Sequence, residues 1–321
     1  MDGQNNTKSM VESGIFTAVA VVLILMCYFL PGFVLVGIFV WPIPITLIYI
    51  RHGGKYSIMS LVVTFIITAM TTDPLTAIGF VSVYGLLGLV LGYCISRKKE
   101  VSTSIFILSI AAFASTMAVF QLFAVITGQD VISQGIATLT KTYQSVKDLY
   151  LGMGMSKETV KTFMATLPTA EIIKMIIPAG FITYSITAAF ICYLITQKVL
   201  KRFRYAIPPI KSLSEWYIPS KASFAIIVIF GVSFLLMYSG FQNGQQYFVN
   251  ANLLFNYAFT VNAVAFASWF LKKREVNKVL RVILIVFFIT PPIGGVLYLL
   301  GVFDYIFDFR KLDPNRKRPN E

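Results

Sequence analysis

Histidine, cysteine and charged side chains are all scarce in this chain of 321 residues. His52 is the single histidine, so a Ser-His-Asp or Cys-His catalytic centre would have only that side chain, which flanks a basic turn. Cys27, Cys94 and Cys192 all lie within apolar blocks and have no metal-ligand spacing. The sequence therefore predicts no disulfide framework, no metal site and no hydrolase of these two types.

Nucleotide-hydrolysing motifs and proton-relay acids are missing as well. No G-x-x-x-x-G-K-[ST] sequence occurs, so any active transport must take its energy from a partner or from an ion gradient. Acidic residues suited to a proton relay are absent from the apolar blocks, which argues against a self-sufficient proton-coupled pump. We therefore expect neither enzyme activity nor a cofactor.

Apolar residues make up 57% of the chain and come in long blocks that carry almost no charge. Each charge at the centre of a bilayer would cost roughly 2.5 to 3.5 kcal/mol on insertion scales, which explains why these blocks exclude charge. The pattern predicts an all-α fold, a polytopic transmembrane helical bundle. Nine spans can be drawn, at 14–30, 33–50, 57–72, 75–95, 103–127, 170–197, 221–241, 250–271 and 281–303.

The 27 basic and 14 acidic residues give a formal charge of +13, and their positions decide what that charge means. Basic residues occupy every second connection between apolar blocks, as the positive-inside rule requires of cytoplasmic loops. The charge therefore indicates topology and contact with anionic lipid, and we expect no nucleic-acid partner. The first block lacks the features of a cleaved signal peptide, so we interpret it as a retained anchor whose amino end faces the cytoplasm. The basic connections contain Arg51 and Lys55; Arg97, Lys98 and Lys99; Lys198, Lys201, Arg202, Arg204 and Lys211; and Lys272, Lys273, Arg274, Lys278 and Arg281.

Residues 128–168 form the only long connection, and their charges nearly cancel, as expected on the outer side. Two apolar stripes at helical spacing, separated by Gly152-Met153-Gly154, predict two amphipathic helices, the second capped by Ser156. Such helices could form a lid over the outer mouth of the bundle, lie in the membrane interface, or offer a surface to a partner. The stripes are Ile132, Ile136, Leu139, Tyr143, Val146 and Tyr150, and then Val160, Phe163, Met164 and Leu167.

The last predicted span carries Pro291-Pro292-Ile293-Gly294-Gly295 at its middle. The prolines remove backbone donors and the glycines add flexibility, so this helix is predicted to be kinked or discontinuous. Nine crossings from a cytoplasmic start would place the basic tail outside, against the positive-inside rule. Two interpretations stay open: a kink within one crossing, or a re-entrant hairpin that returns the tail to the cytoplasm.

Two sets of small residues would allow helices to approach closely. Gly14 and Ala18 lie one turn apart near the cytoplasmic end of the first span, and Gly85, Gly88 and Gly92 line the fourth. Packing within the bundle explains both sets. A docking groove for another membrane subunit is the alternative.

Polar side chains at depth need partners in a low-dielectric setting. Gln121, Glu171, Lys174 and Tyr184 are the candidate lining of an outward-facing solute pocket. Glu171 and Lys174 lie one turn apart near the outer end of the sixth span, so a simple interfacial ion pair is the alternative. Asn252 and Asn256 lie one turn apart in the eighth span and are expected to bond helix to helix, and Asn262 lies below them.

Five segments in order carry a resemblance to a known family. They are 12–23 (ESGIFTAVAVVL), Trp41-Pro42-Ile43-Pro44 before Arg51-His52-Gly53, 85–93 (GLLGLVLGY), Pro208-Pro209 through Trp216 to Pro219, and 303–311 (FDYIFDFRK). Together they resemble the YybS family of bacterial polytopic membrane proteins, whose function is unassigned.

That resemblance implies that the first six helices are similar to the substrate-binding S components of energy-coupling-factor vitamin transporters. In S components, small residues on the first helix dock a transmembrane coupling subunit, and Gly14 and Ala18 match these residues in position and type. An S component ordinarily stops after six helices, whereas this chain adds the long outer loop and about three further helices.

We therefore predict an S-component-like six-helix membrane unit over 1–200, including the outer loop 128–168, and C-terminal membrane helices with a tail over 201–321. The predicted function is to bind or translocate a small or amphiphilic solute in the bacterial cytoplasmic membrane. Expected partners are the lipid bilayer, a small-molecule ligand, and a membrane coupling subunit or other membrane protein. The alternative is a membrane scaffold that recruits partners in envelope or signalling processes.

Overall fold

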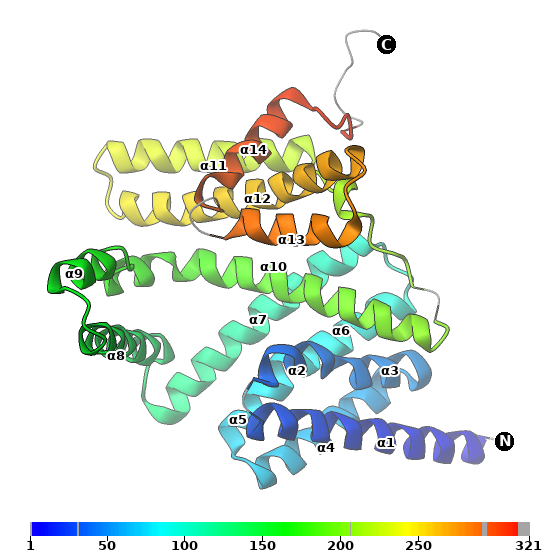
Figure 1. The fold of residues 1–321 in the computed structure, drawn as a ribbon. Coiled ribbons are helices and arrows are strands. Elements are labelled where there is room, and N and C mark those ends of the chain that lie inside the picture. Colours follow the sequence, from blue (N-terminus) through cyan, green and yellow to red (C-terminus); the bar gives the residue numbers. More distant parts are fainter. Residues whose placement is uncertain (1, 31, 206, 291–293, 314–321) are drawn as a thin grey trace. The chain divides into compact units, whose positions relative to one another are not determined.

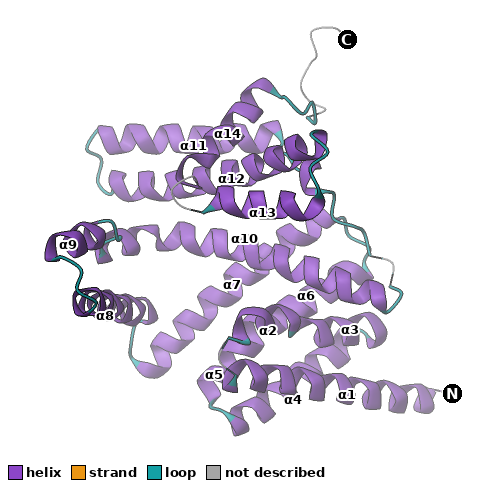
Figure 2. Cartoon of the chain, in the orientation of Figure 1, coloured by secondary structure: helices purple, strands orange, loops and turns teal. Residues whose placement is uncertain are grey.

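The computed structural model describes residues 2–30, 32–205, 207–290 and 294–313. Within these residues the regular structure is helical and contains no strand (Figure 2). The chain divides into two compact units, Met1–Ala170 with Tyr184–Ile210, and Glu171–Thr183 with Lys211–Glu321. Helix α10 (Ala170–Arg202) therefore contributes to both units.

Figure 1 labels the helices in chain order. Besides its part of α10, the first unit contains α1 (Asp2–Phe29), α2 (Val34–Val40), α3 (Pro42–His52), α4 (Gly54–Thr71), α5 (Pro74–Phe80), the π-helical turn η1 (Val81–Gly85), α6 (Leu86–Ser96), α7 (Val101–Thr127), α8 (Val131–Gly152) and α9 (Lys157–Ala165). The second unit contains the short 3₁₀ turn η2 (Leu213–Glu215), α11 (Ser220–Tyr238), α12 (Gly244–Lys273), α13 (Lys278–Ile289) and α14 (Gly294–Phe307). Seven helices of the described residues are long and apolar enough to cross a membrane, and the bent pair α13 and α14 adds an eighth only if it is one span. The nine predicted spans exceed this number because 33–50 forms two short helices and 281–303 forms a bent pair.

Helix α4 shows the polarity expected of a helix surrounded by lipid. Its buried residues are Ser57, Ser60, Thr64 and Thr68, whereas large apolar side chains on the opposite face are exposed. Water would favour the reverse arrangement, but lipid tails solvate apolar side chains and small buried residues let helices approach closely. The exposed set is Ile58, Met59, Val62, Val63, Ile66, Ile67 and Met70. The prediction of an all-α polytopic bundle is confirmed.

Helices α2 and α3 together run back along α1. Trp41, where they meet, is fully buried, and its Nε1 donates to a carbonyl oxygen of α1 at 2.8 Å. On one side of it, a Cβ added to Gly37 would overlap Cys27 of α1. On the other side, His52 Nε2 lies 2.9 Å from Glu12 Oε2. The predicted span 33–50 is thus two short helices that together lie antiparallel to α1.

Helices α12 and α14 run parallel in the second unit. The ring centroids of Phe255 and Tyr298 are 6.2 Å apart, and those of Phe259 and Tyr305 are 6.0 Å apart. Residue number therefore rises in the same direction along both helices. The chain that follows α14 consequently emerges on the side where α12 ends in its basic turn, which is the side predicted to be cytoplasmic.

This parallel packing bears on the two interpretations of the last apolar block. Helix α13 has 12 residues and meets α14 at a bend of 110°. A helix of that length rises about 18 Å, too short for a hydrocarbon core of about 30 Å. The short α13 and the parallel packing of α14 on α12 therefore favour the re-entrant hairpin over the kinked crossing. Of the predicted hinge residues, Gly294 and Gly295 begin α14, and Pro291 and Pro292 lie outside the described residues.

The hairpin predicts a labelling pattern in intact cells. In a background without Cys27, Cys94 and Cys192, a cysteine at Lys311 should be shielded from an impermeant thiol reagent, whereas one at Gln144, on α8, should be labelled. Permeabilised cells provide the control, because both positions should then react. Labelling of the Lys311→Cys variant in intact cells would mean that the last two helices cross the membrane.

Candidate functional site

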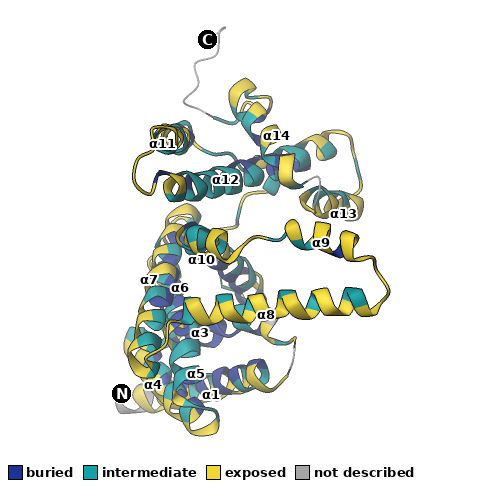
Figure 3. Ribbon diagram, turned by 90° about the vertical axis from the view of Figure 1, so that its left-hand side faces the viewer, coloured by how far each residue is buried: buried dark blue, intermediate teal, exposed yellow. Residues whose placement is uncertain are grey.

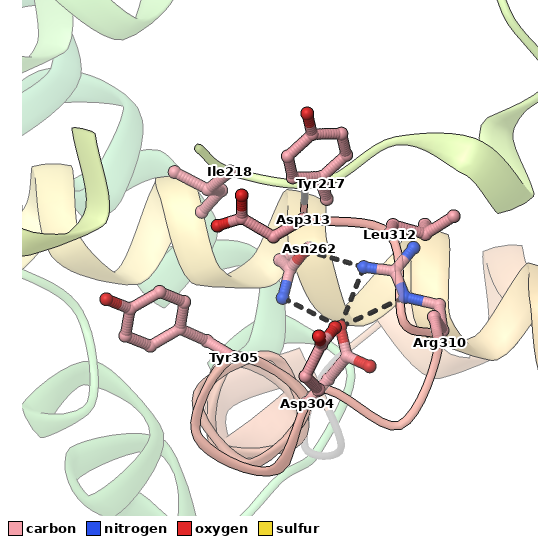
Figure 4. A pocket seen from close by; sticks show the side chains of 9 residues that line it. Tyr217, Ile218, Asn262, Asp304, Tyr305, Arg310, Leu312 and Asp313 are labelled. Carbon is pink, nitrogen blue, oxygen red and sulfur yellow. Dashed lines mark hydrogen bonds and ion pairs between the residues drawn. The ribbon is translucent and has the colours of Figure 1, made fainter. Parts of the chain in front are cut away.

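A buried polar cluster joins α12, α14 and the segment before α11 (Figure 4). Arg310 is only 7% exposed, and its Nη2 donates to Asp304 Oδ2 and to Asn262 Oδ1, both at 2.7 Å. Its Nε donates to the same Asp304 oxygen at 3.0 Å, and its Nη1 donates to the carbonyl oxygen of Trp216 at 2.5 Å. The Asn262 amide donates in turn to Asp304 Oδ2 at 3.1 Å and to the carbonyl oxygen of Gly301 at 2.9 Å. Because these groups bond to one another, the ion pair of Arg310 and Asp304 is stable although it is buried.

The backbone after α14 is bent so that Arg310 returns to the helix it follows. Asp308 and Lys311 have φ angles of 47° and 51°, in the left-handed region that residues other than glycine rarely adopt. Beyond this turn, Asp313 accepts hydrogen bonds from the backbone amide and the hydroxyl of Ser220, at the start of α11. The tail thereby supplies a cap to a helix that begins 93 residues earlier in the chain.

The cluster borders a cavity of about 20 Å³, which has room for about one water molecule. Asp304 Oδ1 is buried there and has no hydrogen-bond partner among the described residues, so it is the natural contact for such a water. The space is too small for a metabolite. The hydrogen bonds around it join the helices to one another. The lining residues are Tyr217, Ile218, Asn262, Asp304, Tyr305, Asp308, Arg310, Leu312 and Asp313.

Only part of this cluster was predicted from the sequence. Asn262 was identified as a polar residue at depth that needs a partner, and 303–311 was recognised as a family-like segment, but the pair of Asp304 and Arg310 was not identified. The sequence did contain one indication of the pair. Asp304 directly follows an apolar block, and an acidic residue at that position requires a partner. A search for a basic residue beyond the end of the helix would have found Arg310.

The four residues predicted to line a solute pocket fall in both units. Gln121 and Tyr184 belong to the first unit, and Glu171 and Lys174 belong to the second. The Tyr184 hydroxyl lies 3.1 Å from the hydroxyl of Tyr84 on η1. No ion pair joins Glu171 to Lys174 in the part of the chain that the structure describes. A common pocket of these four residues stays a prediction.

The two predicted sets of small residues have different surroundings. Gly14 and Ala18 are exposed on α1, and a Cβ added to Gly14 would meet nothing within 4 Å among the described residues. A Cβ added to Gly88 would instead lie 2.6 Å from the carbonyl oxygen of the first residue of α3. A Cβ added to Gly85 would lie 2.9 Å from the Trp41 ring, and one added to Gly92 would lie 2.7 Å from the Tyr49 ring. The glycines of α6 and η1 therefore serve packing inside the unit, whereas the α1 pair is left uncovered.

An asparagine that the sequence reasoning missed bridges two helices. Asn250 donates to the carbonyl oxygen of Met175 at 2.6 Å and accepts from the backbone amide of Ala179 at 2.9 Å. In a regular helix these two backbone groups bond to each other, and Pro178, which lies inside α10, removes a neighbouring backbone donor. The Asn250 side chain is therefore inserted into the backbone ladder of α10. The predicted bridging residue Asn256 has a buried Oδ1 without a partner among the described residues.

The amphipathic helices predicted in the outer connection are confirmed as α8 and α9. Every residue of the first predicted stripe is half-buried, and none of α8 is fully buried. The rings of Tyr150 and Phe163 meet edge to face at 5.3 Å, and Val160 is 1% exposed, so the two helices pack against each other. Ser156 caps α9 by accepting from the amide of Thr159 at 3.1 Å, as predicted. Whether the pair acts as a lid, an interfacial element or a partner surface stays a prediction.

Comparison with known proteins agrees with this membrane architecture. Residues 18–305 match the model of the family described as "Predicted membrane protein (DUF2232)". The chain belongs to this family. It is also 22% identical over 312 residues to "Uncharacterized protein YybS" of Bacillus subtilis (strain 168), a match that covers 95% of this chain and 98% of that protein. No solved structure matches. The predicted family resemblance is confirmed, and the range matched by the DUF2232 family includes Asn262 and Asp304 but ends before Arg310.

Proposed function

We propose that this DUF2232 membrane protein binds a small or amphiphilic solute and, together with a coupling subunit, translocates it without covalent chemistry. The observation that carries the proposal is the open face of α1 at Gly14 and Ala18. Small side chains on a lipid-facing surface allow another helix to approach closely. In S components, which the first six helices are expected to resemble, a coupling subunit docks at this place, and that expectation supports the proposal.

The cytoplasmic end of this face is held in a fixed position. Glu12, half a turn before Gly14, forms an ion pair with Arg51 and a hydrogen bond with His52 at the end of α3. Arg51 Nε also donates to the hydroxyl of Tyr205 at 2.8 Å. These contacts tie α1 to its own unit through its opposite side, so the small-residue face is rigid and free for a partner. Pre-organisation of this kind lowers the free-energy cost of docking.

The docking face can be tested by blocking it with a larger side chain. Changing Ala18 to leucine should lower the amount of a copurifying membrane subunit by about tenfold, because overpacking an interface costs roughly 1–3 kcal/mol. Ala114→Leu, at an exposed position on α7, is the matched control and should leave copurification unchanged. Equal copurification with both variants would contradict docking on α1.

Native mass spectrometry of the same preparations separates the two classes of function. A small molecule retained by the wild-type chain supports solute binding. A stoichiometric protein partner without any small molecule supports the scaffold alternative instead.

A further inference from the structure

We propose that the turn between α12 and α13 binds the phosphate-bearing headgroup of one anionic phospholipid, a site separate from the solute and docking sites proposed above. Within ten residues this turn carries five basic side chains and a single acidic one, Glu275. All of the basic residues except Arg281 are exposed. The basic residues are Lys272, Lys273, Arg274, Lys278 and Arg281.

Arg281 gives this turn a specific anion-binding group in addition to its overall charge. Its Nη2 donates to the carbonyl oxygen of Val276 at 3.0 Å, which fixes the plane of the guanidinium. Its Nε is buried and has no hydrogen-bond partner among the described residues. A charged donor that has lost water and gained no acceptor is unfavourable, and a phosphate oxygen is the acceptor that an arginine fork fits best.

Two of the exposed cations lie at the level where headgroups are expected. The Lys273 ammonium lies 5.3 Å from the ring centroid of Trp269, and the Arg274 guanidinium lies 5.5 Å from that of Phe270. Aromatic residues at the end of a membrane helix mark the boundary between acyl chains and headgroups. Both cations are therefore folded back along α12 toward that boundary.

The helix that follows offers an apolar surface to the same ligand. No residue of α13 is buried, and Val279, Val286 and Phe287 are 66%, 57% and 57% exposed (Figure 3). These side chains continue directly from the basic turn, as acyl chains continue from a headgroup. A free phosphate ester would leave this surface uncovered. The basic turn therefore matches the headgroup of a phospholipid, and the apolar surface of α13 matches its acyl chains.

The test is lipid retention by the purified full-length chain, measured by native mass spectrometry with equal amounts of phosphatidylglycerol and phosphatidylcholine. The wild-type protein should retain one phosphatidylglycerol in preference to phosphatidylcholine. Arg281→Gln should weaken that binding by about fivefold, the size expected for one basic group at a membrane surface. The double variant Lys98→Gln, Lys99→Gln removes two exposed charges from a basic turn of the first unit and should have no effect.

Each contrary result overturns the proposal. Equal weakening by Arg281→Gln and by the Lys98 and Lys99 variant would mean diffuse surface charge, and equal retention of the two lipids would mean no anion site. Complete displacement by glycerol phosphate would assign the turn to a free phosphate ester. If Arg281→Gln does not fold, Lys273→Gln with Arg274→Gln changes exposed groups only, and unaltered phosphatidylglycerol binding in that variant would also overturn the lipid site.

Discussion

Replacement of Arg310 by alanine is expected to lower the free energy of unfolding of the second unit by about 3–5 kcal/mol, the usual loss when one partner of a buried ion pair is removed. The variant would leave the Asp304 carboxylate, which is 5% exposed, without its counter-charge. It would also remove the donor that satisfies the side-chain oxygen of Asn262 and the carbonyl oxygen of Trp216. Thermal unfolding in mild detergent, followed by circular dichroism, measures the effect.

Two further variants separate the ion pair from the other roles of the tail. Lys311→Ala removes an exposed charge next to Arg310 and should leave the unfolding temperature unchanged. The double variant Asp304→Leu, Arg310→Met should be more stable than Arg310→Ala, because the charges are removed together. Equal unfolding temperatures for Arg310→Ala and Lys311→Ala would show that the ion pair contributes nothing.

The placement of the helices could be predicted from the sequence because the bilayer imposes a fixed length and excludes charge. Apolar blocks such as 57–72 and 103–127 correspond to α4 and α7 within a few residues. The outer helices were also predictable, since a stripe at helical spacing and the cap at Ser156 depend on local sequence alone.

The path of the last two helices could not be predicted, because a kinked span and a re-entrant hairpin require the same prolines and glycines. Parallel packing of α14 on α12 favours the hairpin, and that packing joins residues about forty positions apart, such as Asn262 and Asp304. The same limit applies to Asn250, since the helical period gives no indication that it contacts the backbone of α10 beside Pro178.

Small residues show most clearly what the sequence of a single helix cannot predict. Gly14 and Gly88 were predicted with the same alternatives, packing inside the bundle or docking of a partner. Their surroundings differ because Gly88 lies against the backbone of α3, whereas Gly14 has no neighbour within 4 Å among the described residues. Spacing along one helix identifies small faces but does not identify the helix that covers them.

Gly301 provides the second large expected effect, because α12 and α14 approach most closely there. A Cβ at this position would overlap the carbonyl oxygen of Phe259 and lie 2.9 Å from the backbone amide nitrogen of Ala263. Backbone atoms of a packed helix cannot move aside as a side chain can, so Gly301→Ala should destabilise the protein by about 1–3 kcal/mol or more. It should also displace Asp304, one turn later on α14, from its bond to Asn262.

Gly295→Ala is the matched control, since the same substitution on the same helix meets nothing within 4 Å among the described residues. Alanine favours a helix over glycine by up to about 1 kcal/mol, so this variant should unfold at the wild-type temperature or slightly above it. Thermal unfolding compares the two variants, and amide exchange over α14 shows where the loss arises. Faster exchange in α14 with Gly301→Ala alone is expected, because the hairpin is held to α12 by this contact. Equal exchange and equal unfolding temperatures for both variants would contradict close packing of the re-entrant hairpin on α12.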